Sequence, residues 1–274
     1  MLSIRLRVDE RRRDQLIAEL WESGTVGIID DSPDQLRAFF PDGTAIATVL
    51  ERCEAEILDT STVDDDRPES FDHCNWDPIE VGTRFVIAPS WFQGPTAENR
   101  LRLSIDSTNA FGTGRHETTQ LVLEAMEAQP LQHKIVIDVG CGSGILAMAA
   151  RALGASRVFG CDIDPDAVSA ARRHARGASF FKGACDAVRP RTADVVLANI
   201  TPRVIDLLAF ELNRIAREDA FIILSGFLKE NPPRLFRPVK STQKGDWQCW
   251  ICHPDPSLAQ SQSGRVQPFN RVWW

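Results

Sequence analysis

Two kinds of segment are missing from this sequence of 274 residues. No apolar run approaches the roughly 20 residues that a helix needs to cross a bilayer. The first residues alternate between apolar and polar and then become strongly charged, so they contain no signal-peptide core. We therefore expect a cytoplasmic protein that does not interact with membranes.

An excess of basic residues is also absent, because 31 Lys and Arg stand against 38 Asp and Glu. Most of the net charge of −7 lies in residues 1–63, which hold seven basic and thirteen acidic side chains. Such an acidic region does not favour nucleic acid as a direct ligand. It is suited to attracting a basic partner, although carboxylates that only keep a surface soluble would give the same count.

The seven cysteines do not form the two closely spaced pairs of a structural zinc site. Most of them lie in apolar or glycine-rich stretches, where reduced thiols pack as small hydrophobic side chains. One segment, Cys249-Trp-Ile-Cys252-His253, matches the pattern of covalent haem attachment. Haem attachment requires export, so we interpret the spacing as incidental, with metal binding or redox chemistry as the alternatives.

The length and an ordinary composition predict one small and one large domain. The small domain is assigned to residues 1–62. Hydrophobic periodicity there predicts helices and strands in the order β-α-β-β-α-β, at residues 2–8, 9–22, 26–29, 36–40, 44–52 and 54–58. This order is that of a ferredoxin-like α+β fold.

A linker and connecting segment is predicted at residues 63–110. Residues 61–70 have no periodicity and several acidic side chains, as expected of a linker. Two short strands are predicted within the connecting part, at residues 84–88 and 101–105.

The rest of the chain is organised around Ile135-Val-Ile-Asp-Val-Gly-Cys-Gly-Ser-Gly-Ile145. An unbroken apolar run that ends in glycines is typical of a strand buried on both faces of a parallel sheet. Good helix formers follow, from Ile145 to Leu153. Strand, glycine turn and helix open a Rossmann-like unit, whose ligand lies beyond the carboxyl end of the strand. Glycine permits the unusual backbone angles and lets a ligand approach the main chain.

The ligand of this unit is predicted to contain a nucleoside. A second strand, at residues 157–161, ends at Asp162, where a carboxylate can accept hydrogen bonds from both hydroxyls of a ribose. A tight turn with a capping Asp is the structural alternative. Dinucleotide sites favour G-x-G-x-x-G, but Ile145 stands where the third glycine would be, so NAD-dependent oxidoreduction is disfavoured.

Further elements are predicted downstream, at residues 167–175, 179–182, 193–202, 204–215 and 221–225. Pro165 opens the first of them, and the apolar core of the strand at 193–202 ends in Asn199. Asp186 follows one of these strands, where it could meet an adenine amino group or simply lie in a surface turn. Asn199 ends another, at the edge where ligands bind, unless it caps the next helix. The stretch 228–244 is short and rich in proline for a closing helix and strands, and residues 253–274 are predicted to be mostly irregular.

The segments "AFGTGRHETT", "VIDVGCGSGILAMAA", "GCDIDPDAV", "ADVVLANI" and "LSGFL" occur in the order found in the bacterial ribosomal protein L-eleven methyltransferases of the PrmA type. The chain resembles this family from about Asn75 to Phe227. The resemblance implies a class I methyltransferase domain, assigned to residues 111–252, with S-adenosyl-L-methionine as cofactor. It also implies that the ferredoxin-like domain recognises the substrate, a basic ribosomal protein of the large subunit, and we expect a monomer.

The resemblance further suggests site residues. Cofactor contacts are expected from Thr119, Asp138, Gly140, Gly142, Gly144, Asp162, Asp186 and Asn199. The loop 111–119 corresponds to one that closes over the cofactor, and Thr118 or Thr119 is predicted to cap a helix at 120–128. The loop keeps His116, but it has Arg115 and Glu117 where the family usually has Thr and Pro.

The predicted enzyme is a protein N-methyltransferase acting on lysine side chains, the α-amine or both. Catalysis mainly requires a nucleophile in line with the C–S bond of the sulfonium. A lysine with an ordinary pKa of about 10.4 must lose a proton before it attacks. Asn199 could orient the amine through its carbonyl oxygen, and His116 could take the proton. The alternatives are the same domain acting on another protein or a small molecule, and a non-catalytic nucleoside-binding module.

Overall fold

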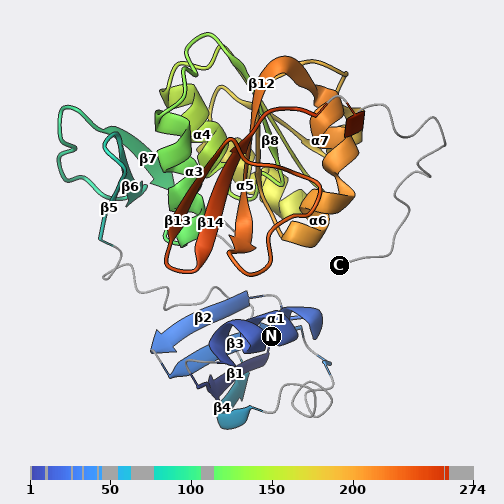
Figure 1. The fold of residues 1–274 in the computed structure, drawn as a ribbon. Helices are drawn as coiled ribbons and strands as arrows, with labels where there is room; N and C mark the ends of the chain where they lie inside the picture. The colour runs from blue at the N-terminus through green and yellow to red at the C-terminus, as the bar shows by residue number, and fades with distance from the viewer. Residues whose placement is uncertain are drawn as a thin grey trace. The chain divides into compact units, whose positions relative to one another are not determined.

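A computed structural model describes residues 2–9, 12–25, 27–32, 34–41, 43–44, 55–62, 77–105, 114–255 and 257–258. These residues divide into two compact units, one ending at Thr62 and the other beginning at Asp77 (Figure 1). No helix in these ranges is both long and apolar enough to cross a membrane.

The small unit is an antiparallel sheet with one described helix. Its elements are β1 (Leu2–Arg7), α1 (Arg13–Glu22), β2 (Gly27–Ser32), β3 (Gln35–Phe40) and β4 (Glu56–Thr62). The strand order β2-β3-β1-β4 places β3 between β1 and β2, which is the split β-α-β arrangement predicted from the sequence. The buried side chains include Ile4, Leu6, Leu16, Leu20, Leu36 and Phe40. The helix predicted at 44–52 lies outside the described residues except for Thr44.

Several predicted boundaries in this unit are wrong. Strand β2 continues to Ser32 and does not end at Ile29. Helix α1 begins at Arg13 rather than Asp9, because the carbonyl of Asp9 accepts the N–H of Arg12 in a preceding turn. Ser61 and Thr62 belong to β4, where they pair with Ser3 and Leu2, and not to a linker. The polar composition of β4 concealed the strand, since most of its side chains are exposed. The rest of the predicted linker lies outside the described residues.

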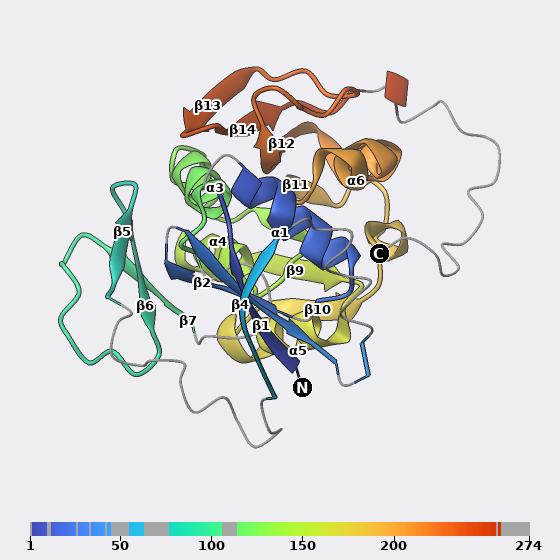
Figure 2. The same ribbon diagram turned by 90° about the horizontal axis from the view of Figure 1, so that it is seen from below.

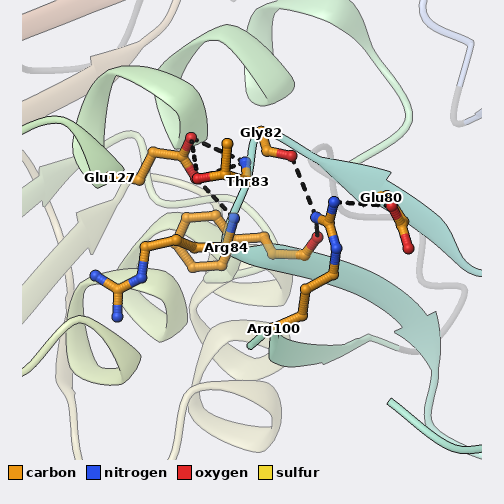
Figure 3. Close-up of polar contacts among 7 residues, drawn as sticks. Glu80, Gly82, Thr83, Arg84, Arg100 and Glu127 are labelled. Carbon is orange, nitrogen blue, oxygen red and sulfur yellow. Dashed lines mark hydrogen bonds and ion pairs between the residues drawn. The ribbon is translucent and has the colours of Figure 1, made fainter. Parts of the chain in front are cut away.

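The large unit begins with a three-stranded sheet of β5 (Ile79–Val81), β6 (Phe85–Pro89) and β7 (Leu101–Ile105). Figure 3 shows how the turn between β5 and β6 is attached to the end of helix α3 (Glu117–Glu127). The Glu127 carboxylate accepts the N–H groups of Thr83 and Arg84, at 3.0 Å each. Arg100 also holds this turn, because its guanidinium group donates to the carbonyls of Gly82 and Phe85 and forms an ion pair with Glu80. The small sheet and α3 are therefore held together.

The main sheet has seven strands in the order β10-β9-β8-β11-β12-β14-β13. The five parallel strands are β8 (Ile135–Val139), β9 (Arg157–Asp162), β10 (Ser179–Lys182), β11 (Ala193–Asn199) and β12 (Ala216–Leu228). The strands β13 (Lys240–Lys244) and β14 (Trp247–Cys252) are antiparallel and complete the sheet. The chain order reverses between β8 and β11, and in open α/β sheets ligands bind at this switch point, beyond the carboxyl ends of the strands.

Helices cover both faces of this sheet (Figures 1 and 2). On one face, α3, α4 (Ile145–Ala152) and α5 (Pro165–His174) pack against alternate strand residues such as Val136 and Leu197. On the other face, α6 (Pro202–Leu207) and α7 (Ala209–Ile215) pack against the intervening ones, such as Ile137 and Val196. Burial on both faces explains why these strands are continuous apolar runs in the sequence.

Beyond Asn199 the sequence predictions are less accurate. The single helix predicted at 204–215 is two helices, α6 and α7, with Leu208 between them. The stretch 228–244 was expected to be too short and too rich in proline for closing strands, but two such strands, β13 and β14, are present. They form because each pairs along its length with a neighbour, so the proline-rich stretch from Pro232 to Pro238 only has to connect β12 to β13.

Candidate active site

The glycine turn after β8 has backbone angles that only glycine adopts readily. Gly140, Gly142 and Gly144 have φ of +73°, +48° and +83°. A Cβ on Gly144 would lie 2.9 Å from the Cα of Ala171 in α5, and one on Gly140 would lie 2.5 Å from the Ile200 side chain. The predicted sequence of strand, glycine turn and helix is confirmed.

Asp162 lies at the rim of this turn, where β9 ends. One oxygen of its carboxylate accepts the N–H of Gly142 at 2.9 Å, and the other accepts the N–H of Asp164 at 3.0 Å. The side chain remains partly exposed. Each oxygen retains a second lone pair, so Asp162 can support the turn and still accept hydroxyl hydrogen bonds from a ribose.

Asp138 lies at the end of β8 and is completely buried. Neither of its carboxylate oxygens has a hydrogen-bonding partner in the described structure. Burial is the main cause that raises the pKa of Asp138 to about 8; the negative charge of Asp162 acts in the same direction and the main-chain N–H of Ala147 in the opposite one. Its side chain is thus enclosed by protein, in contrast to the partly exposed carboxylate of Asp162.

Asn199 ends β11, directly across the switch point. Its amide nitrogen donates to the hydroxyl of Thr119, in the first turn of α3, at 3.3 Å. Its amide oxygen is buried and has no hydrogen-bonding partner in the described structure. Asn199 does not cap the helix that follows, because the N-cap of α6 is Thr201. The position of Asn199 at the ligand-binding edge of the sheet is therefore the one predicted.

His116 is the N-cap of α3, so the prediction that Thr118 or Thr119 caps this helix is wrong. The helix begins three residues earlier than predicted, because the Nδ1 atom of His116 accepts the N–H of Thr118 as a capping Asp or Asn oxygen would. Nδ1 is also 2.8 Å from the Thr118 hydroxyl. The imidazole ring packs edge-on against Trp247 of β14, with 4.7 Å between the ring centroids.

Asp186 is exposed in a short 3-10 turn, η2 (Cys185–Ala187), which follows β10. Its main-chain carbonyl accepts a hydrogen bond from Arg214 at 3.1 Å. Asp186 therefore lies in the connection from β10 to β11, beside α7, whereas the glycine turn, Asp162 and Asn199 lie at the ends of three adjacent strands.

The Cys249 and Cys252 side chains do not face one another. They are three positions apart along β14, and successive side chains of a strand point to opposite faces. Cys249 packs in the core beneath α3, and Cys252 packs in the core beneath α7. The two thiols cannot bind one metal ion or one haem together, which supports incidental spacing. The described residues also contain no group of three or more His, Cys, Asp or Glu that could hold a metal.

Gly226 is a site residue that sequence reasoning did not single out. It has φ of +96° and lies at a bulge where the pairing of β12 with β14 shifts register. A Cβ there would lie 2.4 Å from the carbonyl oxygen of Ile200, so glycine lets the segment after Asn199 pass close to β12. An isolated glycine within an apolar strand is a signal for such an approach. Trp247, the neighbour of His116, has no comparable signal.

The predicted cofactor fits the chemistry of these side chains. In the described part of the large unit, the buried side-chain atoms without a hydrogen-bonding partner are the two oxygens of Asp138 and the amide oxygen of Asn199. The amide oxygen of Asn199 is an acceptor, and the Asp138 carboxyl accepts through at least one of its oxygens. Both side chains lie near the carboxyl ends of neighbouring strands. Acceptors concentrated at one edge suit ligands that bring positive charge or N–H groups. S-adenosylmethionine, with its sulfonium and α-ammonium groups, is a ligand of this kind.

Comparisons with known proteins agree with this chemistry. A family model described as ribosomal protein L11 methyltransferase (PrmA) matches residues 8–252. The chain is 35% identical over 254 residues to the ribosomal protein L11 methyltransferase of Synechococcus elongatus, covering 82% of this chain and 84% of that one. It is 30% identical to the protein of the same name from Acinetobacter baumannii, covering 84% and 87%.

Among solved structures, the chain is similar to a ribosomal protein L11 methylase from Lactobacillus delbrueckii subsp. bulgaricus. The TM-score is 0.60 and the sequence identity 27%, over 66% of this chain and all of that one.

Proposed function

Because the chain belongs to the ribosomal protein L11 methyltransferase (PrmA) family of S-adenosylmethionine-dependent enzymes, we propose that it methylates nitrogen atoms of ribosomal protein L11. The acceptors are lysine side chains, the α-amine or both. One observation carries the proposal. The glycine turn and the Asp162 carboxylate lie on one side of the switch point, and the Asn199 amide oxygen, which has no hydrogen-bonding partner in the described structure, lies on the other.

The residues of the β8–β9 side are assigned to the cofactor. S-adenosylmethionine supplies a methyl group that is already activated on its sulfonium. The turn from Gly140 through Gly142 to Gly144 lets a ligand approach the main chain, and Asp162 accepts its ribose hydroxyls. Asp186 is assigned to the adenine amino group. Asp138 is enclosed, so we assign it to the support of the turn from beneath.

Asn199 is assigned to the substrate nitrogen. An entering ammonium would be disfavoured in the enclosed surroundings of Asn199, which is only 9% exposed. The amide oxygen of Asn199 can accept one N–H of the neutral amine and so direct its lone pair. His116 was the candidate proton acceptor, but a proton at its Nδ1 would end the cap on Thr118. We therefore assign His116 to the position of the α3 N-terminus.

The small unit is assigned to substrate recognition. Nearly all of the chain's net negative charge lies in residues 1–63, which supports a basic ribosomal protein as the partner. We place the enzyme in the cytoplasm, as a monomer, without direct contact to nucleic acid or membrane.

The test is transfer of labelled methyl groups from S-adenosylmethionine to purified L11. Asn199→Ala should slow single-turnover transfer about a hundredfold, comparable to the loss of one oriented polar group from other active sites, with cofactor affinity retained. Asn213→Ala is the matched control, since Asn213 is a buried asparagine that only joins Ala209 to Asp255. Bound cofactor without label in L11 would contradict the proposal, and an unchanged rate in Asn199→Ala would contradict the assignment of the site.

A further inference from the structure

The turn η2, which carries Asp186, is attached to the ribose side of the site. Lys182 at the end of β10 pairs with Asp162 in the sheet, and the next N–H, that of Gly183, donates to the main-chain carbonyl of Asp162 at 2.8 Å. Gly183 has φ of +143°, so glycine allows the chain to turn at this point. Asp186 follows three residues later with an exposed side chain, where a base joined to a ribose at Asp162 can meet it.

One arginine of α7 holds the main chain of this turn. A guanidinium nitrogen of Arg214 donates to the carbonyls of Cys185 and Asp186, at 3.2 and 3.1 Å. The Cys185 carbonyl also accepts the N–H of Val188 at 3.1 Å, and the Cys185 side chain is completely buried. These contacts fix the carbonyls of both residues, and with them the direction in which the Asp186 side chain leaves the main chain.

The guanidinium group is itself held in place by a neighbour in α7. A carboxylate oxygen of Glu211 lies 2.6 Å from both Nε and Nη2 of Arg214, and the two side chains are only 15% and 18% exposed. An ion pair this enclosed loses hydration, so it contributes little net stability by itself. The planar guanidinium can, however, donate to a carboxylate and to main-chain carbonyls at the same time. This geometry favours a role in fixing the turn.

We propose that Arg214 is a positioning residue for cofactor recognition, which fixes η2 so that the Asp186 carboxylate meets the adenine amino group. Arg214 acts through the turn, and its effect is on the choice of base. This inference rests on the proposed function, in which Asp186 is assigned to the adenine amino group. It extends the cofactor site to α7, a helix on the opposite face of the sheet from α4 and α5.

The test compares two ligands that differ by one amino group. S-adenosylhomocysteine keeps the adenine of the cofactor, and its purine analogue has hydrogen in place of the 6-amino group. Wild type should bind S-adenosylhomocysteine about tenfold more tightly, as expected from one hydrogen bond to a carboxylate. Asp186→Ala should bring this ratio close to one. Isothermal titration calorimetry measures both dissociation constants.

The decisive variant is Arg214→Lys, which keeps the positive charge beside Glu211 but loses the planar group that reaches both carbonyls. It should reduce the ratio to about threefold or less. The control is Arg172→Lys, because Arg172 of α5 also donates to a main-chain carbonyl, that of Phe180 within β10, at 2.8 Å. This contact lies outside the turn, so the control should keep the wild-type ratio.

A double-mutant cycle separates positioning from a structural effect. In an Asp186→Ala background, Arg214→Lys should not change the ratio further, because the carboxylate on which it acts is gone. If Arg214→Lys does not fold, the double variant Glu211→Gln with Arg214→Gln takes its place, since it exchanges the ion pair for two neutral amides.

Two results would overturn the proposal. The first is an equal loss of affinity for both ligands in Arg214→Lys, which would indicate a merely structural role. The second is a wild-type ratio near one, or no binding of either ligand, since there would then be no amino-group contact to position. Failure of methyl transfer to L11 is distinguishable, because wild-type enzyme would then leave L11 unlabelled while the ratio of the two dissociation constants still follows Arg214.

Discussion

The two sides of the switch point differ in charge. On the β8–β9 side, two carboxylates flank the glycine turn, Asp138 beneath it and Asp162 at its rim. On the β11–α3 side, the polar groups that meet are the neutral amide of Asn199 and the hydroxyl of Thr119. A cationic cofactor is stabilised by negative charge, whereas a nucleophilic amine has to be uncharged when it reacts. The separation of the two kinds of group lets one edge of the sheet meet both requirements.

The largest expected effect comes from a charge on the neutral side. Asn199→Asp keeps the shape of the side chain but introduces a carboxylate, which should raise the pKa of the bound substrate amine by about 1 to 3 units. Transfer near neutral pH should therefore slow by about ten- to a thousandfold and recover as the pH is raised. Single-turnover rates from pH 7 to 10 measure this, with Asn199→Ala as the control. A profile parallel to that of Asn199→Ala would contradict the need for a neutral side.

A smaller effect is expected when charge is removed from the other side. Asp162→Ala loses an acceptor for the Gly142 N–H and for the ribose, so the affinity for S-adenosylmethionine should fall about ten- to a hundredfold. Isothermal titration calorimetry measures this directly. The control is Asp164→Ala, which removes only the N-cap of α5 and should cost about 1 kcal/mol of stability. Equal affinities for the two variants would show that the carboxylate of Asp162 does not select the cofactor.

The last expected effect concerns the second carboxylate of this side, and it is on stability and not on methyl transfer. With a pKa of about 8 in the folded chain, against 3.8 ordinarily, Asp138 holds a proton that the unfolded chain releases. The free energy of unfolding should therefore fall as the pH rises from about 4 to 8. Above pH 8 the contribution becomes constant.

Asp138→Asn removes this dependence, because its amide is neutral throughout. Urea unfolding at pH 5.5, 7.0 and 8.5 should show a steeper decline of stability for wild type than for the variant. Parallel declines would mean that Asp138 is charged in the folded protein, and the β8–β9 side would then present two negative charges near neutral pH instead of one.

Much of the large unit is predictable from the sequence because its strands follow recognisable hydrophobic patterns, alternating in β7 and continuous in β8. The predicted ranges of β7, β8 and β10 agree with the structure to the residue. The glycine turn and Asp162 were recognisable because their spacing along the chain is local. In these regions the hydrophobic pattern and the glycine positions carry the information.

The contacts that complete the site are not local, and the sequence alone does not contain them. Thr119 and Asn199 meet only because α3 packs against the main sheet. The close approach of Gly226 to Ile200 depends on a bulge in the pairing of β12. The cap by His116 was missed because threonine is the commoner capping residue, although the imidazole nitrogen has the same acceptor geometry here.

The cysteines of the described large unit have a consequence for the chemistry of the whole chain. Cys141, Cys161, Cys185, Cys249 and Cys252 are all buried, and burial raises the pKa of each thiol, to about 12 for Cys185, Cys249 and Cys252. The thiolate is the form that reacts with alkylating reagents. These thiols therefore do not react while the large unit is folded. The rate of their alkylation measures how often the helices separate from the sheet by local or global unfolding.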